Sequence, residues 1–373
     1  MTDASLKTVE IDPYAALQDK EPPRAPRNQW LDVWDQFKKH KGAVFGGGFL
    51  LFITLAVLLG PYIWNVDPQK LDIRNKDARP IWTLIWDSSA KTLWHRPFGT
   101  DNLGRDILSN MIAGGRASMA VGWTAMLLSL SIGTAVGVAA GYFKRLDGLL
   151  MRLTDLFLSL PILPLLLVAV TLFRQPLRAN FGPEGGMFIL IVVIVGITSW
   201  MQTARIVRGE ILALKEREFI LAARSIGTSP GAIIRRHLLP NVVSPIMVSA
   251  TLGLAVAIIT ESALSFLGVG FPSDFPTWGK MLADAVPRME EYPERVLLPG
   301  IAISLTVLGV NYLGDGLRDA EAPVEVNLRC VRSSRHHPPG KDCSFLFEFP
   351  KNDTDISERV VPCISQGRRW PPR

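Results

Sequence analysis

The segment Ala43–Trp64 reads AVFGGGFLLFITLAVLLGPYIW and carries no charged side chain. A helix needs about 20 mostly apolar residues to cross the hydrocarbon of a bilayer, because every backbone polar group must find its partner inside the segment. This segment therefore predicts a membrane-spanning helix. The apolar run is too long for a secretory signal and no small-residue cleavage site follows it, so we expect it to stay in the mature protein.

Five further segments are long, apolar and poor in charge: about 118–142, 149–173, 186–204, 242–268 and 296–314. The chain is 48% hydrophobic with a mean hydropathy of +0.22, which exceeds the values of an ordinary soluble domain. We therefore predict an all-α, polytopic membrane protein with about six transmembrane helices. In the segment 149–173, Arg152, Asp155, Pro161 and Pro164 predict a kinked helix, which a helix bundle tolerates.

Positive charges flank these segments unevenly, and Lys and Arg are enriched in the cytoplasmic loops of membrane proteins. They cluster before the first segment, after the second and after the fourth: Lys38, Lys39 and Lys41; Lys144, Arg145 and Arg152; Arg205, Arg208, Lys215, Arg217, Arg224, Arg235 and Arg236. These clusters predict cytoplasmic loops and place both termini inside. The stretch 65–117 is basic as well, but its length permits translocation regardless of charge, so we place it outside.

The chain divides into regions of different composition. Residues 1–28 are polar and contain several prolines, which predicts a disordered cytoplasmic N-terminus. Trp30, Val33, Trp34 and Phe37 recur at helical spacing, which indicates an interfacial amphipathic helix before the first span. The predicted regions after 1–28 are therefore this helix with the first span at 29–64, an external loop at 65–117, a core of five spans at 118–320 that includes the cytoplasmic loop 205–241, and a disordered tail at 321–373.

Composition argues against several other functions. The net charge of +6 is spread over juxtamembrane loops, where contact with lipid headgroups is a simpler interpretation than nucleic-acid binding. The two Gly-Lys pairs lack the other residues of a P-loop, so we expect no ATP binding by that motif. Cys330, Cys343 and Cys363 all follow the last span, and His336-His337 with Cys343 has irregular spacing, so we expect neither a disulfide framework nor a metal site.

The loop between the fourth and fifth spans carries the strongest local signals. Gly227 stands where a first helix would need a left-handed residue to end. Thr228 or Ser229, followed by Pro230, forms the start signal of a second helix, which we expect to end before Pro240. Such a helix pair, continuous with the flanking spans, would transmit a push from a partner into the membrane. A solvated loop is the alternative; a DNA-binding helix-turn-helix is disfavoured by the flanking spans.

Two polar features lie near the other membrane face. Glu261 is the charged residue most clearly within an apolar segment, and a buried ionisable group in a membrane is by default a functional residue. It lies toward the outer end of its span, so a pore-facing position in a translocation path and an interfacial position are both open. The stretch His95–Asp106, HRPFGTDNLGRD, combines two glycines, a proline and alternating charges before the second span.

The residues LAARSIG at 221–227, nine further residues and HLLP at 237–240 resemble the EAA loop of permeases of ATP-binding cassette (ABC) importers, whose pattern is E-A-A-x-x-x-G-x9-I-x-L-P. Leu221 replaces the glutamate of this pattern and removes a salt bridge to the ATPase, and His237 replaces the isoleucine. In that family the loop docks into a groove on the ATPase subunit. The resemblance implies that the following residues couple the chain to an ATPase: Leu221, Ala222, Ala223, Arg224, Gly227, Pro230, His237, Leu239 and Pro240.

Three separated motifs narrow the resemblance: HRPFGTDNLGRDILS at 95–109, RRHLLPN at 235–241 and ESALSFLGVGFPSDFPTWGKML at 261–282. Over roughly Trp30–Pro323 the chain is similar to the C-type permease of dipeptide, oligopeptide and nickel importers. This implies a type I ABC importer permease fold in the bacterial inner membrane, with a second permease subunit, two ATP-binding subunits and an extracytoplasmic solute-binding protein as partners. It also implies residues for the external gate or the binding-protein contact: Gly99, Thr100, Asp101, Gly104, Arg105, Asp106, Pro276, Trp278 and Gly279.

We therefore predict a permease that forms half of a translocation path for di- or oligopeptides or related small solutes, with Glu261 as a candidate residue of that path. It would have no catalytic residue, metal or cofactor, because ATP hydrolysis belongs to the partners. The alternative is an ion-gradient-driven secondary transporter or channel, which predicts an ionisable relay or an inverted repeat. A membrane enzyme would need a paired nucleophile and base, but all five histidines lie outside the apolar segments.

Overall fold

The computed structural model consists of two compact units, 1–320 and 321–373. In the second unit three short strands pair antiparallel in the order β1–β2–β3: β1 Leu328–Arg329, β2 Ser344–Phe347 and β3 Val360–Pro362. The predicted disorder of 1–28 and the predicted amphipathic helix at 30–37 lie outside the described residues. The structure describes residues 38, 40–85, 91–272, 274–321, 328–329, 344–347 and 360–362.

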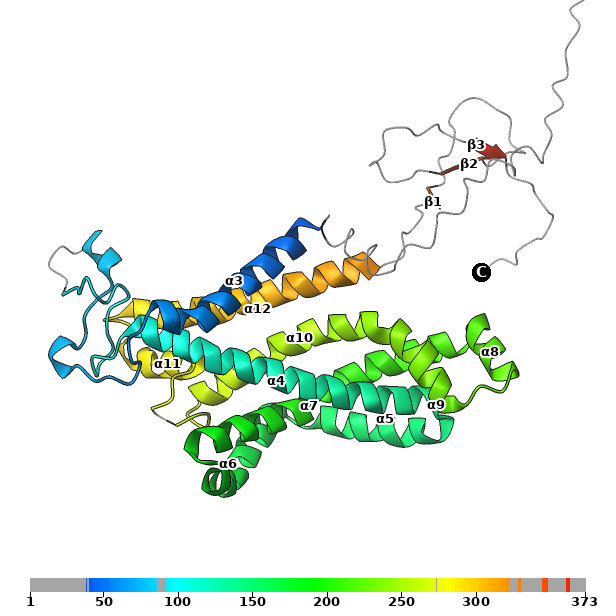
Figure 1. Cartoon of the computed structure of the whole chain (residues 1–373), viewed down its shortest axis with the longest axis horizontal. Helices are drawn as coiled ribbons and strands as arrows, with labels where there is room; N and C mark the ends of the chain where they lie inside the picture. The colour runs from blue at the N-terminus through cyan, green and yellow to red at the C-terminus, as the bar shows by residue number, and fades with distance from the viewer. Residues whose placement is uncertain are drawn as a thin grey trace, which may run out of the picture. The chain divides into compact units, whose positions relative to one another are not determined.

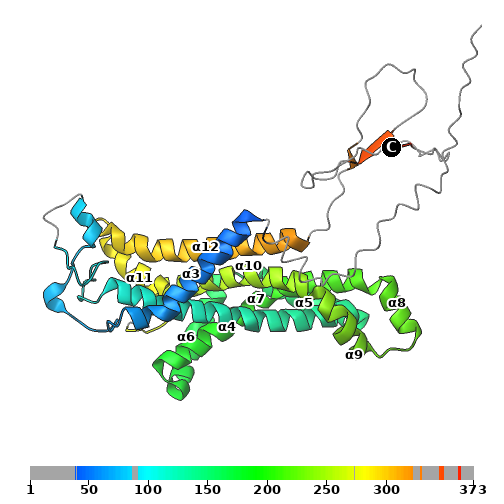
Figure 2. The same ribbon diagram turned by 45° about the horizontal axis from the view of Figure 1, so that its top comes forward.

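Within the described residues of the first unit, six helices are long and apolar enough to cross a membrane, as the sequence predicts. Their bounds are α3 Lys41–Ile63, α4 Ile107–Tyr142, α6 Ile162–Phe181, α7 Pro183–Lys215, the joined α9 and α10 over Pro230–Phe266, and α12 Pro293–Glu321. They form a bundle from which α6 projects obliquely (Figures 1 and 2).

The helices α4 and α7 form the centre of the bundle because α4 presents a stripe of glycines to α7. Gly133, Gly137 and Gly141 recur every four residues and so share one helix face. A Cβ built on Gly137 would lie 2.7 Å from the carbonyl oxygen of Ala204, and one on Gly141 would lie 2.7 Å from the Ile211 side chain. Small residues at this spacing let two membrane helices approach closely, which is the main source of packing energy in lipid.

The helices α3 and α12 pair along one side of the bundle (Figures 1 and 2). Gly46 of α3 approaches the backbone of α12, since a Cβ there would lie 2.7 Å from the carbonyl oxygen of Gly309. Leu50 of α3 and Val310 of α12 are buried in one apolar cluster with Leu254 and Ile258 of α10. The first and last spans are thereby attached to the core.

The predicted third span is wrong in one respect, because the chain breaks there instead of kinking. Two separate helices, α5 Lys144–Ser159 and α6 Ile162–Phe181, replace a single helix over 149–173. Leu160 is extended at φ −79° and ψ 136°, and Pro161 precedes the first residue of α6. Proline excludes the helical conformation from the residue before it and offers no N–H, so the helix ends at this point.

Short elements occupy the two ends of the bundle. One end, called the α11 end, carries α11 Trp278–Ala285, followed by the 3₁₀ turn η4 Val286–Arg288. The connection 64–106 lies at the same end and contains the 3₁₀ turns η1 Ile73–Asn75 and η2 Ile81–Ile85. The α8–α9 end carries α8 Glu218–Ser225 and α9 Pro230–Ile233. Figure 2 shows α11 and α8 at opposite ends of the long helices.

Candidate functional site

The segment 216–240 forms the turned helix pair that the sequence predicts. Gly227 has φ +80° and ends α8 in the left-handed conformation. The Thr228 N–H donates to the carbonyl of Ala223 at 3.1 Å, and the Gly227 N–H donates to that of Arg224 at 2.9 Å. These two bonds form a Schellman motif, which satisfies the last carbonyls of the helix. Pro230 is the first residue of α9, as predicted.

Two details of the predicted helix pair are wrong. The second helix does not end before Pro240, because the π-helical turn η3 Ile234–Leu238 joins α9 to α10, Leu239–Phe266, in one continuous helix. The Leu239 N–H donates to the carbonyl of Ile234, five residues back, and Pro240 follows directly, where the π turn already interrupts the i→i−4 bonds of the helix. The first helix is interrupted between Lys215 and Glu218.

The two faces of α8 have opposite environments. Ile220 is fully buried in an apolar cluster contributed by α4, α7 and α9–α10, and Ala223 is 7% exposed. On the other face, Phe219 and Leu221 are about half exposed, and Ile226 is 83% exposed. The inner face holds α8 rigidly, whereas the outer face presents apolar side chains without a contact in this chain's own core.

The remaining predicted coupling residues lie on α8, α9, η3 and the first turn of α10. Ala222, Gly227, Pro230 and Pro240 are exposed, and Leu239 is half-buried. The guanidinium of Arg224 lies 5.7 Å from the ring centre of Tyr142, and the ring of His237 lies 6.5 Å from that of Phe219. The structure therefore brings the predicted residues together on one end of the bundle, with Ala223 directed inward as the exception.

At the α11 end, the stretch 99–106 folds into a rigid turn against residues 72–78. Gly99 and Gly104 have φ values of +80° and +78°, and a Cβ on Gly104 would lie 1.9 Å from the carbonyl oxygen of Asp72. Thr100 is fully buried; its hydroxyl donates to the carbonyl of Asn75 at 2.6 Å and accepts from the N–H of Ala78 at 3.0 Å. Only glycine satisfies both the conformation and the close approach.

The acidic residues of this stretch fix its connection to α4. Asp101 accepts hydrogen bonds from the N–H groups of Leu103 and Arg105 and pairs with the Arg105 guanidinium at 2.7 Å. Asp106 is the N-cap of α4, accepting from the N–H of Ser109 at 2.9 Å and from the Trp64 indole at 2.7 Å. One carboxylate thereby joins the end of α3 to the start of α4.

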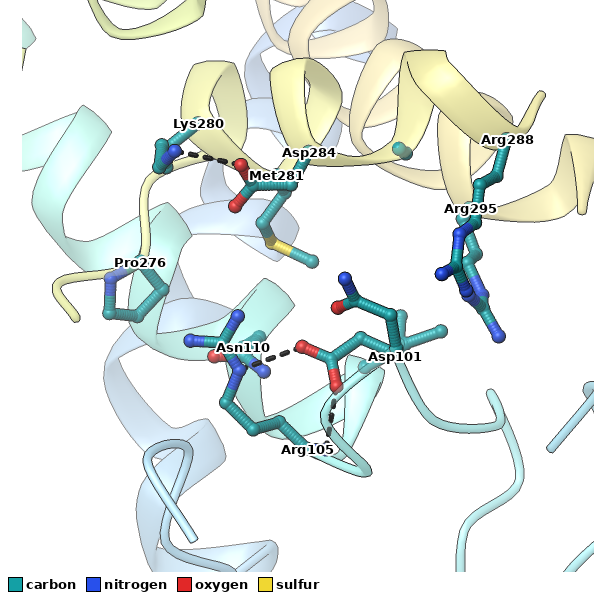
Figure 3. A pocket seen from close by; sticks show the side chains of 12 residues that line it. Asp101, Arg105, Asn110, Pro276, Lys280, Met281, Asp284, Arg288 and Arg295 are labelled. Atoms are coloured by element: carbon teal, nitrogen blue, oxygen red, sulfur yellow. Dashed lines mark hydrogen bonds and ion pairs between the residues drawn. The ribbon is translucent and has the colours of Figure 1, made fainter. Parts of the chain in front are cut away.

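A pocket lies between the turn 99–106 and α11 (Figure 3). Pro276 lines it together with Asp101 and Arg105, so the pocket brings together two predicted external segments far apart in sequence. Figure 3 shows Arg288 and Arg295 at one side of this pocket. Its lining is Asp101, Asn102, Arg105, Ile107, Asn110, Pro276, Lys280, Met281, Asp284, Ala285, Arg288 and Arg295.

Trp278 and Gly279 attach α11 to the bundle. The Trp278 side chain is 2% exposed, and its indole N–H donates to the carbonyl of Met111 at 3.0 Å. A Cβ on Gly279 would lie 2.2 Å from the carbonyl oxygen of Ser262, so α11 touches the backbone of α10 there. These two predicted residues serve packing within the chain rather than an exposed contact.

Glu261 is fully buried where α10, α4 and residues 277–279 meet. The Ser265 hydroxyl donates to its Oε1 at 2.7 Å, and the hydroxyls of Ser118, Thr277 and Ser262 also face the carboxylate. This environment places the side chain inside the subunit rather than on a surface. The position favours a role in holding the α11 segment on α4 and α10.

Two ion pairs between α5 and α7 are absent from the sequence prediction. Arg208 binds Asp147 through two hydrogen bonds, one of them 2.8 Å between Nη2 and Oδ2, and Arg205 pairs with Asp155. The sequence analysis names Asp155, Arg205 and Arg208 but not their partners, which depend on α5 lying along α7. The exposure of Ile226 is a second feature that the motif alone does not indicate.

Comparison with known proteins defines the class of protein. Residues 108–323 match the family described as the binding-protein-dependent transport system inner membrane component, and residues 28–80 match the N-terminal TM domain of oligopeptide transport permease C. The chain belongs to this family of inner-membrane transport components. It is a multi-pass inner-membrane permease subunit of an ABC importer, whose partners include an ATPase and a substrate-binding protein. It is not itself an enzyme, because separate subunits hydrolyse ATP.

Individual relatives resemble nearly the whole chain. The dipeptide transport system permease protein DppC of Alkalihalophilus pseudofirmus is 36% identical over 85% of this chain and 99% of its own length. The oligopeptide transport system permease protein OppC of Bacillus subtilis is 34% identical over 79% of this chain and 89% of its own. An inward-facing MetNI methionine ABC transporter structure is 19% identical, covers 56% of this chain and 94% of that chain, and has a TM-score of 0.44.

Proposed function

We propose that this permease carries dipeptides or oligopeptides into the cell, together with a second, different permease subunit. The names of the two relatives above support the peptide cargo. We further propose that both termini and the α8–α9 end face the cytoplasm, with the α11 end outside. The basic residues that flank α8 and α9 support this orientation.

In this proposal the outer face of α8 docks on an ATPase subunit. The supporting observation is the contrast between its two faces: Ile220 anchors the helix in the core, while Phe219, Leu221 and Ile226 leave an apolar surface exposed. Apolar side chains exposed together on a short helix are typical of a protein contact. Because α9 continues into α10 through the π turn, movement of this surface on ATP-driven closure of the ATPases would tilt a membrane span directly.

The path itself would run along a groove between α5–α6, α7 and α10. The groove mixes apolar residues with neutral polar ones such as Thr198, Ser199 and Gln202. Neutral polar groups of this kind suit a passage for solutes of varied side chain, because they bind weakly enough to release. A second permease subunit would close the open side of this groove. The solute-binding protein would contact the turn 99–106 and the rim of the pocket between that turn and α11, including Asp101, Arg105 and Pro276.

Purification of the tagged chain from mild detergent tests the proposal. We expect the wild-type chain to bring down an ATPase and a second permease. The Ala222→Arg/Ile226→Asp variant, which places two charges on the outer face of α8, should lose the ATPase but keep the second permease. Gly148→Arg on α5 is the control, because nothing lies within 4 Å of that exposed glycine. A wild-type chain that purifies without any ATPase contradicts the proposal and favours a gradient-driven carrier.

A further inference from the structure

A second, strongly basic pocket lies at the α11 end, between α6 and the segment that connects α10 to α11. Its lining consists of Arg174, Arg178, Gly268, Phe271, Pro272 and Lys280. Three of these residues are cations and none is acidic. Nothing described above uses Arg174 or Arg178, so the pocket requires its own explanation.

The two arginines lie one helical turn apart on α6, so their positive charges lie close together and repel each other. Each is partly buried, and the Nε atom of each is buried without a hydrogen-bond acceptor. Among the described residues no carboxylate forms an ion pair with either guanidinium, whereas Lys280 is paired with Asp284 at 2.7 Å. Two partly buried guanidinium groups without a counter-ion are unfavourable unless an anion binds between them.

The helix and the connection that border this pocket are packed firmly against the rest of the chain. The last turn of α6 contacts α7 directly, because a Cβ on Gly186 would lie 2.4 Å from the carbonyl oxygen of Leu177. Phe271 is 5% exposed and stacks on Phe275 with 4.9 Å between ring centres. A fixed pair of arginines matches a planar carboxylate better than a flexible pair does, since less side-chain entropy is lost on binding.

We propose that Arg174 and Arg178, assisted by the charge of Lys280, bind the carboxylate group of the transported solute at the α11 end of the path. The inference rests on the proposed function, because peptides carry a terminal carboxylate at neutral pH. The helix α6 borders both features: Ile162 near its start lines the groove proposed as the path, and Arg174 and Arg178 toward its end line the pocket. The site would receive the carboxylate as the solute enters the permease. A phosphate of a lipid headgroup has related chemistry and is the other source of an oxyanion.

Uptake by the complete transporter in vesicles distinguishes these sources. The probes are trialanine and trialanine amide, which differ only in the terminal carboxylate, and the same solute-binding protein is used throughout. The quantity measured is the ratio of kcat/KM for acid over amide. Dividing this acid-over-amide ratio for a variant by the ratio for the wild type cancels the preference of the solute-binding protein itself.

The Arg174→Gln/Arg178→Gln variant should lower the acid-over-amide ratio about tenfold through loss of charge-assisted hydrogen bonds. Arg174→Lys/Arg178→Lys should keep most of the ratio, and Arg145→Gln, an exposed arginine on α5, should leave it unchanged. If the double Gln variant fails to assemble, each single Gln variant is measured instead. An unchanged ratio in an assembled, transporting Gln variant overturns the proposal.

The lipid arm repeats the assay in vesicles of phosphatidylcholine alone and with phosphatidylglycerol added. We expect the double Gln variant to lose its preference for the acid in both kinds of vesicle. A defect that appears only with phosphatidylglycerol, and equally for acid and amide, assigns the arginines to lipid phosphate and overturns the proposal. Failure of the wild-type transporter to take up either peptide would contradict the proposed peptide cargo instead, so the two failures are distinguishable.

Discussion

At the scale of single residues, glycine positions set the turns of this chain for two different reasons. Gly104 combines a positive φ with a backbone contact from Asp72 that leaves no room for a Cβ, whereas Gly227 has a positive φ in open space. The sequence motif marks both glycines equally. The contact partner of Gly104 lies some thirty residues earlier in the chain, so only the structure separates the two cases.

This difference predicts unequal effects of the same substitution. Gly104→Ala should destabilise the 64–106 connection by about 2–4 kcal/mol, because it adds a steric clash to the strained backbone. Gly227→Ala should cost only about 1 kcal/mol. Proteolysis of the purified protein would detect the opening of residues 64–106. Gly48→Ala on α3, where nothing lies within 4 Å, is the control and should resist as the wild type does. Equal resistance of all three variants would contradict this account.

A second prediction concerns the ion pair between α5 and α7. A hydrogen bond from Arg208 holds the pKa of the Asp147 carboxyl below its ordinary value of 3.8, since the nearby positive charge favours the ionised form. A lowered pKa in the folded state adds stability that is present above the ordinary value and is lost as pH falls through the lowered one. The contribution should therefore be constant from about pH 5 to pH 8.

Thermal unfolding of wild type and Asp147→Asn over this pH range checks the prediction. We expect a constant difference of about 1 kcal/mol, because the pair is partly exposed. Asp155→Asn removes the more exposed pair with Arg205 and should have a smaller effect. A difference between wild type and Asp147→Asn that grows between pH 5 and pH 8 would show that another group titrates at this contact.

At the scale of elements, apolar length predicts the number of spans but not their ends. The second span begins at Ile107, within the polar stretch assigned to the external loop, because Asp106 caps it there. The third span is broken at Pro161, where the sequence analysis predicts only a kink. The ends of these helices depend on capping and packing, and hydropathy reports neither.

The glycine stripe of α4 gives a prediction at this scale. Gly137→Ala should destabilise the bundle by about 1–3 kcal/mol, because the new methyl group would meet the backbone of α7 at 2.7 Å. Gly253→Ala on α10 is matched in chemistry but has its nearest contact at 3.7 Å, so improved helix propensity should leave it neutral or slightly stabilised. Thermal unfolding of the purified chain in detergent compares the two, and equal destabilisation would contradict close α4–α7 contact as the basis of the core.

At the scale of the whole molecule, the motifs mark residues at both ends of the bundle but not the direction of each side chain. The EAA-like pattern places Ala223 beside Ala222, yet only Ala222 faces outward, because α8 turns Ala223 onto its own core. The α11 pocket joins Asp101 to Pro276 through folding that no local pattern reveals. Arg174 and Arg178 carry no motif, and their significance appears only from the absence of a carboxylate partner among the described residues.

The central claim is that ATP-driven movement of the ATPase subunits reaches the translocation path through the outer face of α8. Peptide uptake and ATP hydrolysis by the reconstituted transporter, measured together with and without solute-binding protein, test it most directly. For Ile226→Asp we predict that binding protein no longer stimulates ATP hydrolysis and that uptake falls at least about tenfold, while Gly148→Arg behaves as wild type. Full stimulation and full uptake by an Ile226→Asp transporter would contradict the claim.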